Sequence, residues 1–224
     1  MVVPMSPPSS PEVFANRREA GRVLADTLAS ALPNGADVVV LALPRGGVPV
    51  AAPVATALNA PLDVLVVRKL GVPGQPELAM GAIAGVAGSV EVVRNERVLT
   101  SVGVSDADFE AVLAAETREL EEREARLRST VPVEVAGRTV VLVDDGLATG
   151  STMRAAVAAV RRRGPERIVV AVPVGAPSTC AWLAEEVDLL VCPRQPTRFR
   201  AVGAAYDDFT QTTDDEVRAL LAPP

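Results

Sequence analysis

Short apolar runs that alternate with stretches of helical periodicity constrain the fold of this chain most strongly. Continuous runs rich in valine, leucine and alanine occupy residues 38–43, 62–67, 139–143, 168–172 and 187–191. Runs of this length are typical of strands that are buried on both faces, as in a parallel sheet. Because helical segments separate them, the sequence predicts an α/β fold with a mainly parallel twisted sheet flanked by helices.

The segments between and around these runs show helix and turn signals. Helices are expected over residues 16–31, 48–58, 105–128, 153–163, 178–186 and 214–221. Asn16 can cap the first helix, with Glu19 at the capping-box position. We interpret the charges of the helix over 105–128 as a solvated face, with the i,i+4 pairs Glu119/Arg123, Glu122/Arg126 and Glu124/Arg128. A Gly/Pro-rich loop is expected at 71–76 and a hairpin at 82–93, around Gly88.

The chain has no internal repeat and no clean linker, so a single domain over residues 14–224 is expected. Residues 1–13 are rich in Pro and Ser, which predicts a flexible N-terminal tail. This tail lacks the basic and apolar regions of a signal peptide, and the apolar runs are too short to span a bilayer. We therefore expect a soluble cytoplasmic protein with no membrane partner.

Composition excludes several classes of chemistry. The chain contains no histidine, which rules out Ser-His-Asp and Cys-His catalysis and the HExxH zinc site. Lys69 is the single lysine against 21 arginines, and genomic base composition is the simplest explanation of that imbalance. A net charge of −6 argues against nucleic acid as a partner. The two cysteines, Cys180 and Cys192, form neither a disulfide framework nor a zinc site and are expected as small buried side chains.

The segment that carries chemistry runs from Val140 to Thr152. It consists of an apolar strand, the adjacent carboxylates Asp144 and Asp145, a loop of small residues and a helix start. Ligands of open α/β sheets bind beyond the carboxyl ends of the strands. Backbone amides of such a loop, together with the N-terminus of the following helix, can bind a phosphate without any lysine. Asp144 and Asp145 are then placed to accept hydrogen bonds from a sugar diol, so the segment suits a phosphorylated ribose.

The pattern of four apolar residues followed by Asp-Asp-x-x-Ala-Thr-Gly-x-Thr resembles the phosphoribosyl pyrophosphate (PRPP) signature of type I phosphoribosyltransferases. The resemblance extends from about Phe14 onward and is strongest to bacterial members whose acceptor is unassigned. It implies that Asp144 and Asp145 bind the ribose hydroxyls. It also implies that the 5′-phosphate lies on the loop formed by Ala148, Thr149, Gly150, Ser151 and Thr152.

Two further segments acquire a role from the resemblance. Leu43-Pro-Arg-Gly-Gly47 follows the first strand, and in the family this loop grips pyrophosphate and often contains a non-proline cis peptide, which points to Arg45 and Gly46. Arg68 and Lys69 end the next apolar run, where cations of the family face pyrophosphate and the following segment closes over the site. Glu77 on that segment is a candidate acid or base by analogy alone. Plain turns and solvated cations remain the alternatives for these residues.

The acceptor side is the least defined. The resemblance implies a core over about residues 36–192 and a hood built from about 14–34 and 193–224. Phe199 and Val202 in this hood could pack against an acceptor ring or belong to the core, and the sequence favours neither. Hypoxanthine-guanine enzymes carry an Asp directly before Thr-Gly, whereas this chain has Ala148 as adenine-type enzymes do, so the general base of the 6-oxopurine enzymes is missing. The Ala-Thr-Gly form does not by itself establish adenine, and the acceptor stays open.

The resemblance implies transfer of ribose 5-phosphate from PRPP to a nitrogen of a nucleobase-like acceptor, with release of pyrophosphate. The catalytic candidates are Asp144, Asp145, Lys69 and Glu77. Mg²⁺ is the implied cofactor and would bind with PRPP, with Asp144 and Asp145 as its only candidate protein ligands; a homodimer is compatible with the family. A regulator that binds PRPP without turnover is the alternative. A dinucleotide-dependent oxidoreductase is disfavoured, because no GxGxxG follows the first strand.

Overall fold

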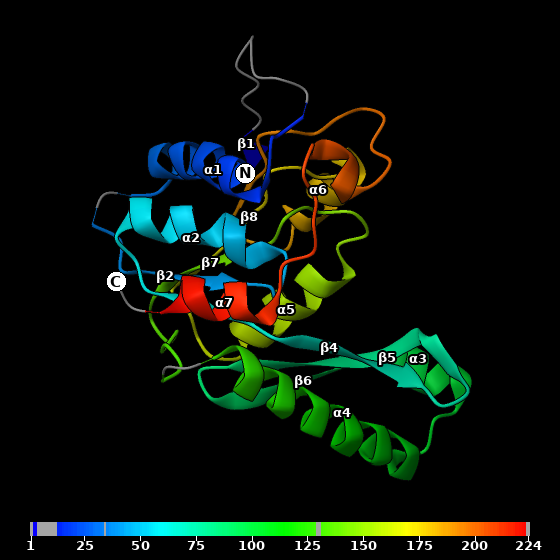
Figure 1. The fold of residues 1–224 in the computed structure, drawn as a ribbon. Coiled ribbons are helices and arrows are strands. Elements are labelled where there is room, and N and C mark those ends of the chain that lie inside the picture. The colour runs from blue at the N-terminus through cyan, green and yellow to red at the C-terminus, as the bar shows by residue number, and fades with distance from the viewer. Residues whose placement is uncertain (1, 4–12, 34, 129–130, 223–224) are drawn as a thin grey trace.

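A computed structural model describes residues 2–3, 13–33, 35–128 and 131–222 (Figure 1). Its central feature is a six-stranded sheet in the order β1-β9-β8-β7-β2-β3, and every neighbouring pair is parallel. The strands are β1 (Val2–Val3), β2 (Val38–Ala42), β3 (Leu62–Val64), β7 (Thr139–Val143), β8 (Arg167–Ala171) and β9 (Leu189–Val191). The predicted parallel sheet is confirmed.

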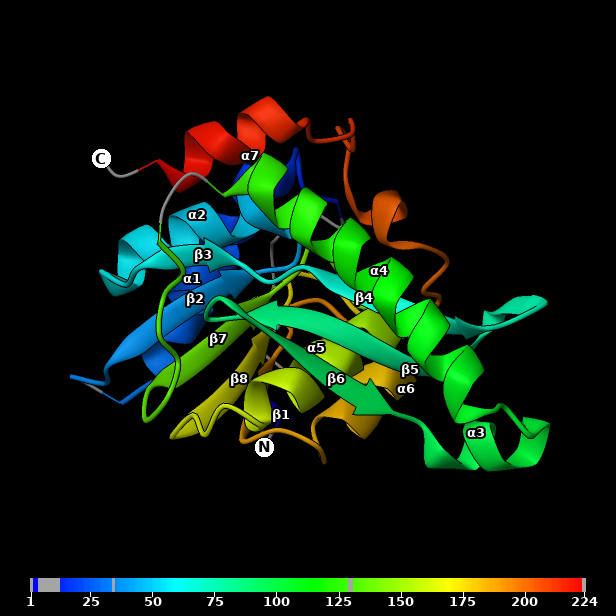
Figure 2. The ribbon, with the colours of Figure 1, turned by 90° about the horizontal axis from the view of Figure 1, so that it is seen from below.

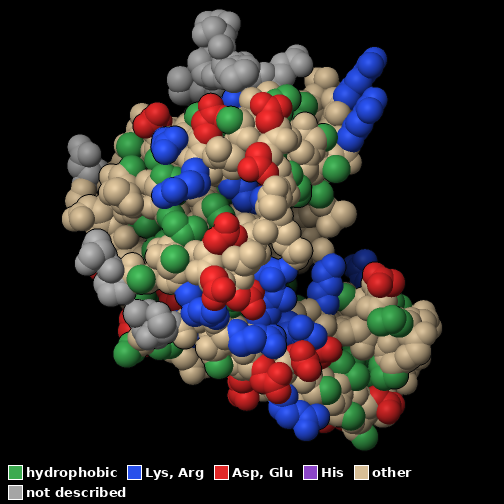
Figure 3. All heavy atoms as spheres, viewed as in Figure 1, with side chains coloured by type: hydrophobic (Ala, Val, Ile, Leu, Met, Phe, Trp, Pro, Cys, Tyr) green, Lys and Arg blue, Asp and Glu red, His purple; other side chains and the backbone are tan. Residues whose placement is uncertain are grey.

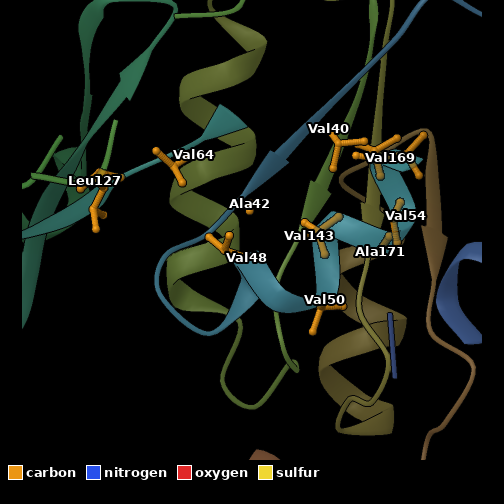
Figure 4. Packing of buried hydrophobic residues seen from close by; sticks show 14 of the residues in the cluster. Val40, Ala42, Val48, Val50, Val54, Val64, Leu127, Val143, Val169 and Ala171 are labelled. Carbon is orange, nitrogen blue, oxygen red and sulfur yellow. The ribbon is translucent and has the colours of Figure 1, made fainter. Parts of the chain in front are cut away.

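Helices cover both faces of this sheet. Successive residues of a strand point to opposite faces, and in these strands the residues on both faces are apolar. Residues 38, 40 and 42 of β2 enter one apolar core, whereas 39 and 41 enter the other. Figure 4 shows the first core, where residues of β2, β7 and β8 pack with the valines of α2 (Gly47–Leu58). The second core lies under α5 (Ser151–Arg161) and α6 (Pro177–Leu183).

Helix α1 (Arg17–Ala31) packs closely on α2. Gly21 permits this approach, since a Cβ atom there would lie 2.4 Å from the backbone oxygen of Val50. Asn16 caps α1 as expected, and its side chain accepts a hydrogen bond from the Glu19 amide at 3.0 Å. The helix therefore begins at Arg17, which fixes the position of that side chain relative to the sheet.

A second, antiparallel sheet lies beside the main body. It contains β4 (Val67–Val72), β5 (Gln75–Val86) and β6 (Ser89–Arg94), in that order. The hairpin expected around Gly88 is confirmed, because β5 and β6 flank Gly88 and it has a φ of +77°. Figure 2 shows α4 (Asp106–Leu127) crossing one face of this sheet, with α5 beyond the other.

Two sequence expectations in this region are wrong. The apolar run over 62–67 is not one strand: it is divided between β3 in the parallel sheet and β4 in the antiparallel one, and both sheets bury it. The expected loop at 71–76 shortens to a turn at residues 73–74 with Gly74 at φ +78°. Gly71 allows the strands to continue toward this turn, because a Cβ atom there would lie 2.7 Å from the oxygen of Pro76. Helix α3 (Glu96–Val102) was not expected.

The two terminal segments meet over the sheet. Phe14 forms a parallel bridge with Tyr206, next to the 3-10 helix η1 (Val202–Ala205), and α7 (Asp214–Leu221) packs against α2 and α4. Of the expected flexible tail, residues 1 and 4–12 lie outside the described residues, whereas Val2–Val3 forms β1. Within the described part of the chain, no helix has both the length and the apolar character that crossing a membrane requires.

Candidate active site

Asp144 and Asp145 follow β7 directly and are half-buried. Asp144 Oδ1 accepts a hydrogen bond from the Asp145 amide at 2.8 Å, and Asp145 Oδ2 accepts one from Arg17 Nε at 2.9 Å. Burial, and then the neighbouring charge of Asp145, raise the pKa of Asp144 well above its usual range. Burial also raises the pKa of Asp145, but Arg17 opposes that shift. The pair is therefore short of positive charge, as expected of carboxylates that bind a donor or a cation.

The loop after the aspartates is held by its backbone. Leu147 donates its amide to the Val174 carbonyl at 2.9 Å, and Thr179 donates its hydroxyl to the Ala148 carbonyl at 2.6 Å. Gly150 takes the N-cap position of α5 with a φ of +74°, and no side chain in the described part of the chain caps this helix. The first amides of α5 thus lack a side-chain acceptor, which favours an anion there. The hydroxyls of Thr149 and Ser151, which are 3.4 Å apart, lie at the same place and are exposed, as are Ala148 and Thr152.

The loop after β2 lies against the aspartates. Because β2 and β7 pair in register from Val38–Thr139 to Ala42–Val143, their following loops leave the sheet side by side. The Pro44–Arg45 peptide bond is cis. A Cβ atom at Gly46 would lie 2.1 Å from Asp145 Oδ2, and one at Gly47 would lie 2.7 Å from the Val143 oxygen. Only glycine fits this contact, so the structure brings Gly46 and the two aspartates together.

The cations are more dispersed. Arg45 forms an ion pair with Asp214 of α7 at 3.2 Å, and Arg68 on β4 forms one with Glu116 of α4 at 2.5 Å. Lys69 is exposed on β4. Glu77 is exposed near the start of β5, beside the turn of the hairpin that projects from the body in Figure 2. Among the described residues, no hydrogen bond or ion pair joins Glu77 to the aspartates.

The hood candidates lie in a small apolar cluster with Phe14, Val174 and Tyr206. Phe199 and Val202 are both half-buried at its edge. Val202 also covers the loop after the aspartates, since a Cβ atom at Gly146 would lie 2.5 Å from Val202 Cγ1. Val202 thus packs on Gly146, the residue after Asp145, whereas Phe199 contacts the other residues of the cluster.

Sequence reasoning missed three residues that contact the aspartates or their neighbours. Arg17 binds Asp145 and also donates to the Thr210 carbonyl at 2.9 Å. Tyr206 donates its hydroxyl to the Asp145 carbonyl at 2.5 Å, and the Phe209 ring lies 3.8 Å from the Arg17 guanidinium carbon. These contacts join segments far apart in sequence, so no local pattern signals them.

Two hollows border the site. One has a volume of about 1040 Å³ and lies over α5, between α6 and the β5–β6 hairpin, with Thr149 and Ser151 in its lining. The other, about 300 Å³, is lined by Arg45 and by residues 211–215 and 218. Cys180 and Cys192 are buried as expected, and the Cys192 thiol donates to the Arg194 carbonyl at 3.3 Å. Among the described residues, no group of three acidic or thiol side chains forms a metal site of its own.

Comparison with known proteins identifies the family. The family model described as "Phosphoribosyl transferase domain" matches residues 12–181. The chain belongs to this family. The resemblance drawn from the Val140–Thr152 segment is thereby confirmed, together with the predicted α/β fold class.

Several relatives extend the comparison. Two proteins of Mycobacterium tuberculosis, MT0597 (strain CDC 1551 / Oshkosh) and Rv0571c (strain H37Rv), carry a provisional phosphoribosyl transferase name. Each is 48% identical over 211 residues, a match that covers 94% of this chain and 46% of the relative. The chain thus spans about half the length of these curated relatives. The crystal structure of TT1426 from Thermus thermophilus is 42% identical, with a TM-score of 0.79, and the match covers 93% of this chain and 97% of that one.

Proposed function

We propose that this phosphoribosyl transferase domain transfers ribose 5-phosphate from PRPP to a nitrogen of a nucleobase-like acceptor and releases pyrophosphate. One observation carries the proposal. Asp144 and Asp145, whose pKa values are raised, and the N-terminus of α5, which has no side-chain cap among the described residues, follow the same strand, and the loop with Gly46 and Gly47 packs against them. The N-terminus of α5 offers a site for the 5′-phosphate, the carboxylates offer a site for the ribose diol, and the loop with Gly46 offers a site for pyrophosphate. PRPP carries these three groups in the same order.

In this proposal the substrate lies along the carboxyl edge of the sheet. The 5′-phosphate accepts hydrogen bonds from the amides of residues 148–152 and from the hydroxyls of Thr149, Ser151 and Thr152. Asp144 and Asp145 accept the ribose 2′- and 3′-hydroxyls. Arg45, Gly46, Arg68 and Lys69 bind the pyrophosphate group. The ribose ring then bridges two anion sites, which fixes its C1 atom for attack.

The reaction needs charge stabilisation more than proton transfer. As the bond between C1 and the pyrophosphate oxygen breaks, positive charge grows on the ring and negative charge on the leaving group, as in other glycosyl transfers. Carboxylates beneath the ring and cations on the leaving group stabilise both charges, and closure of the β4–β5 hairpin over the site would exclude water. None of these tasks requires histidine, which agrees with its absence from the chain.

Mg²⁺ fits the same residues. It prefers oxygen ligands and is commonly bound through one or two carboxylates together with substrate phosphates. Asp144 and Asp145 supply such carboxylates, and their raised pKa values indicate that a positive charge is lacking there. When bound, the ion would neutralise part of the pyrophosphate charge.

The direct test is release of pyrophosphate from PRPP across a panel of nucleobases, with Mg²⁺ present. Release that depends on one class of base supports the proposal and identifies the acceptor. Tight PRPP binding with no release across the panel would replace it with a non-catalytic PRPP-binding regulator. The acceptor panel should include adenine-type bases as well as 6-oxopurines, because Ala148 takes the place of the Asp that 6-oxopurine enzymes carry.

Lys69→Ala should lower kcat by about 100-fold, because it removes a cation from the developing charge of the leaving group. Lys69 is exposed, so the melting temperature should stay within about 1 °C of wild type. Steady-state kinetics and thermal melts measure the two effects, and Lys69→Arg should recover most of the activity. Unchanged kcat in Lys69→Ala would remove this lysine from the site.

Arg17→Gln should shift the acid limit of PRPP binding to higher pH. Arg17 opposes the rise in the pKa of Asp145, so without it that pKa rises further and the carboxylate is protonated at a higher pH. PRPP affinity measured by calorimetry across a pH series gives the midpoint for each variant. Arg18→Gln, which removes an exposed cation from the next position, should leave the midpoint unchanged. A midpoint that does not move in Arg17→Gln contradicts the assignment.

A further inference from the structure

The face of helix α4 that packs on strands β4 and β5 contains both charged and apolar side chains. Glu116, Leu120, Arg123 and Leu127 recur at i, i+4, i+7 and i+11, which places them on the same side of the helix. Leu120 and Leu127 are buried, and Glu116 binds Arg68 of β4. The charges of α4 are therefore not all on a solvated face, contrary to the interpretation from sequence.

Arg123 points from this face to the loop after β2. It is half-buried, and its Nη2 donates to the Pro44 carbonyl at 3.4 Å. The expected partner Glu119 is exposed, and among the described residues Arg123 has no carboxylate at ion-pair distance. Of the three expected i,i+4 pairs of α4, Glu124–Arg128 is present at 3.1 Å.

Three arginines from separate elements thus converge on one place. Arg45 comes from the loop after β2, Arg68 from β4 and Arg123 from α4. Burial and the charges of Arg45 and Arg68 lower the pKa of Arg123, whereas Asp214 opposes that shift. Figure 3 shows Lys and Arg side chains gathered on this face of the molecule. Crowded cations of this kind are unfavourable by themselves and favour an anion with several charges.

We propose that Arg123 is a third arginine that binds the leaving pyrophosphate, together with Arg45 and Arg68. This inference rests on the proposed function. A guanidinium group offers two parallel N–H donors to phosphoryl oxygens, and Arg123 already reaches the Pro44–Arg45 loop through its contact with the Pro44 carbonyl. In the reaction, the bond between C1 and the pyrophosphate oxygen breaks and its electron pair leaves with pyrophosphate. The acceptor nitrogen forms the new bond to C1, and its proton passes to an oxygen of the departing pyrophosphate. Arg123 stabilises the charge that the leaving group gains.

Asp214 adds a second observation at the same place. Its Oδ1 lies 3.2 Å from Arg45 Nη1, so two carboxylates, Asp214 of α7 and Glu116 of α4, oppose the three cations. The ion pair is partly exposed, which makes it weak and replaceable. Pyrophosphate, with more charge than one carboxylate, can displace Asp214 from Arg45.

The test compares two ligands that occupy different parts of the site. Binding of inorganic pyrophosphate with Mg²⁺, and separately of ribose 5-phosphate, is measured by calorimetry for wild type, Arg123→Gln, Arg123→Lys and Arg118→Gln. Arg123→Gln should weaken pyrophosphate binding by about 10- to 100-fold, because a charge-assisted bidentate contact is lost. Binding of ribose 5-phosphate should be unchanged, and Arg123→Lys should fall between Arg123→Gln and wild type. Arg118→Gln, which removes an exposed cation of the same helix, should match wild type for both ligands.

The outcomes separate this inference from the proposed function. A wild-type protein that binds neither ligand nor PRPP overturns both. A wild-type protein that binds both ligands, with an Arg123→Gln variant of unchanged pyrophosphate affinity, overturns only the role of Arg123. Equal weakening of both ligands in Arg123→Gln also overturns it, because that result assigns Arg123 to the structure of the site instead of to the leaving group.

Discussion

Replacing Asp144 and Asp145 by asparagine should weaken PRPP binding by at least about 100-fold, since both acceptors of the ribose diol lose their charge. Asparagine keeps the size of the side chain, and its oxygen can still accept the 2.8 Å hydrogen bond from the residue 145 amide. Calorimetric titration with PRPP and Mg²⁺ measures the loss. Asp26→Asn, at an exposed position of α1, is the matched control and should bind PRPP as wild type does.

The single variant Asp144→Asn should also be more stable than wild type at neutral pH, by on the order of 1 kcal/mol. The folded-state pKa of Asp144 lies above its ordinary value of 3.8, so the folded protein holds this proton at a pH where the unfolded chain has lost it. The stability contributed by protonated Asp144 is complete below the unfolded pKa and is lost as the pH rises through the folded pKa. Asparagine has no carboxyl group to ionise, so the Asp144→Asn variant keeps this stability at neutral pH.

Thermal melts at several pH values test whether Asp144→Asn raises or lowers the stability. The gain of Asp144→Asn should be present at neutral pH and vanish below about pH 4, where the aspartic acid is neutral in both states. A variant that binds PRPP normally would refute the site. A variant that loses binding but is less stable at neutral pH would leave the site intact and contradict the electrostatic account of Asp144.

The second large effect concerns the fold. Gly21→Ala should destabilise the protein by about 2–3 kcal/mol, because the new methyl group overlaps the backbone oxygen of Val50 and the ring of Pro53. In an exposed helix the same change would stabilise by about 0.5–1 kcal/mol, so the sign itself is informative. Denaturant unfolding measures the difference, and the melting temperature should fall by about 5–10 °C.

Arg22→Ala supplies the control, since Arg22 is the next residue of α1 and is exposed. Its stability should change by less than about 0.5 kcal/mol. If Gly21→Ala is as stable as wild type or more so, α1 does not approach α2 as closely as described. The effect should extend to ligand binding, because α1 also carries the Arg17 that holds Asp145.

The sequence predicts the parallel sheet well, because burial on both faces produces uninterrupted apolar runs such as Val38–Leu43 and Thr139–Val143. It also predicts the loop between β7 and α5, since a run of small residues after the aspartates interrupts both the strand and the helix pattern. The same reasoning fails at residues 62–67, where one apolar run serves two sheets. A hydrophobic pattern records that a residue is buried, and not which sheet buries it.

The contributions of Arg17, Tyr206 and Arg123 could not be predicted for a different reason. Each acts on a segment distant in sequence. Arg17 and Arg123 have an ordinary local explanation as helix residues, and Tyr206 has one as a buried aromatic side chain. Arg123 belongs to a regular series of charged residues on α4, and only the position of the second sheet decides which of them face inward. Tertiary contacts of this kind leave no trace in local periodicity.

The meeting of the terminal segments over the aspartates has a consequence for how the molecule forms. Tyr206, whose hydroxyl holds the Asp145 carbonyl, is separated from Asp145 by 61 positions, and Arg17 by 128. Residues 206–210 follow β9 in the chain, so the Tyr206 contact, and the contact of Arg17 with Thr210, need residues that are synthesised after every strand of the parallel sheet. During synthesis the parallel sheet can assemble once β9 has emerged, but the contacts around Asp145 have to wait for residues 206–210. A chain interrupted after Val191 therefore contains every strand of the parallel sheet but lacks the tyrosine that holds the Asp145 carbonyl.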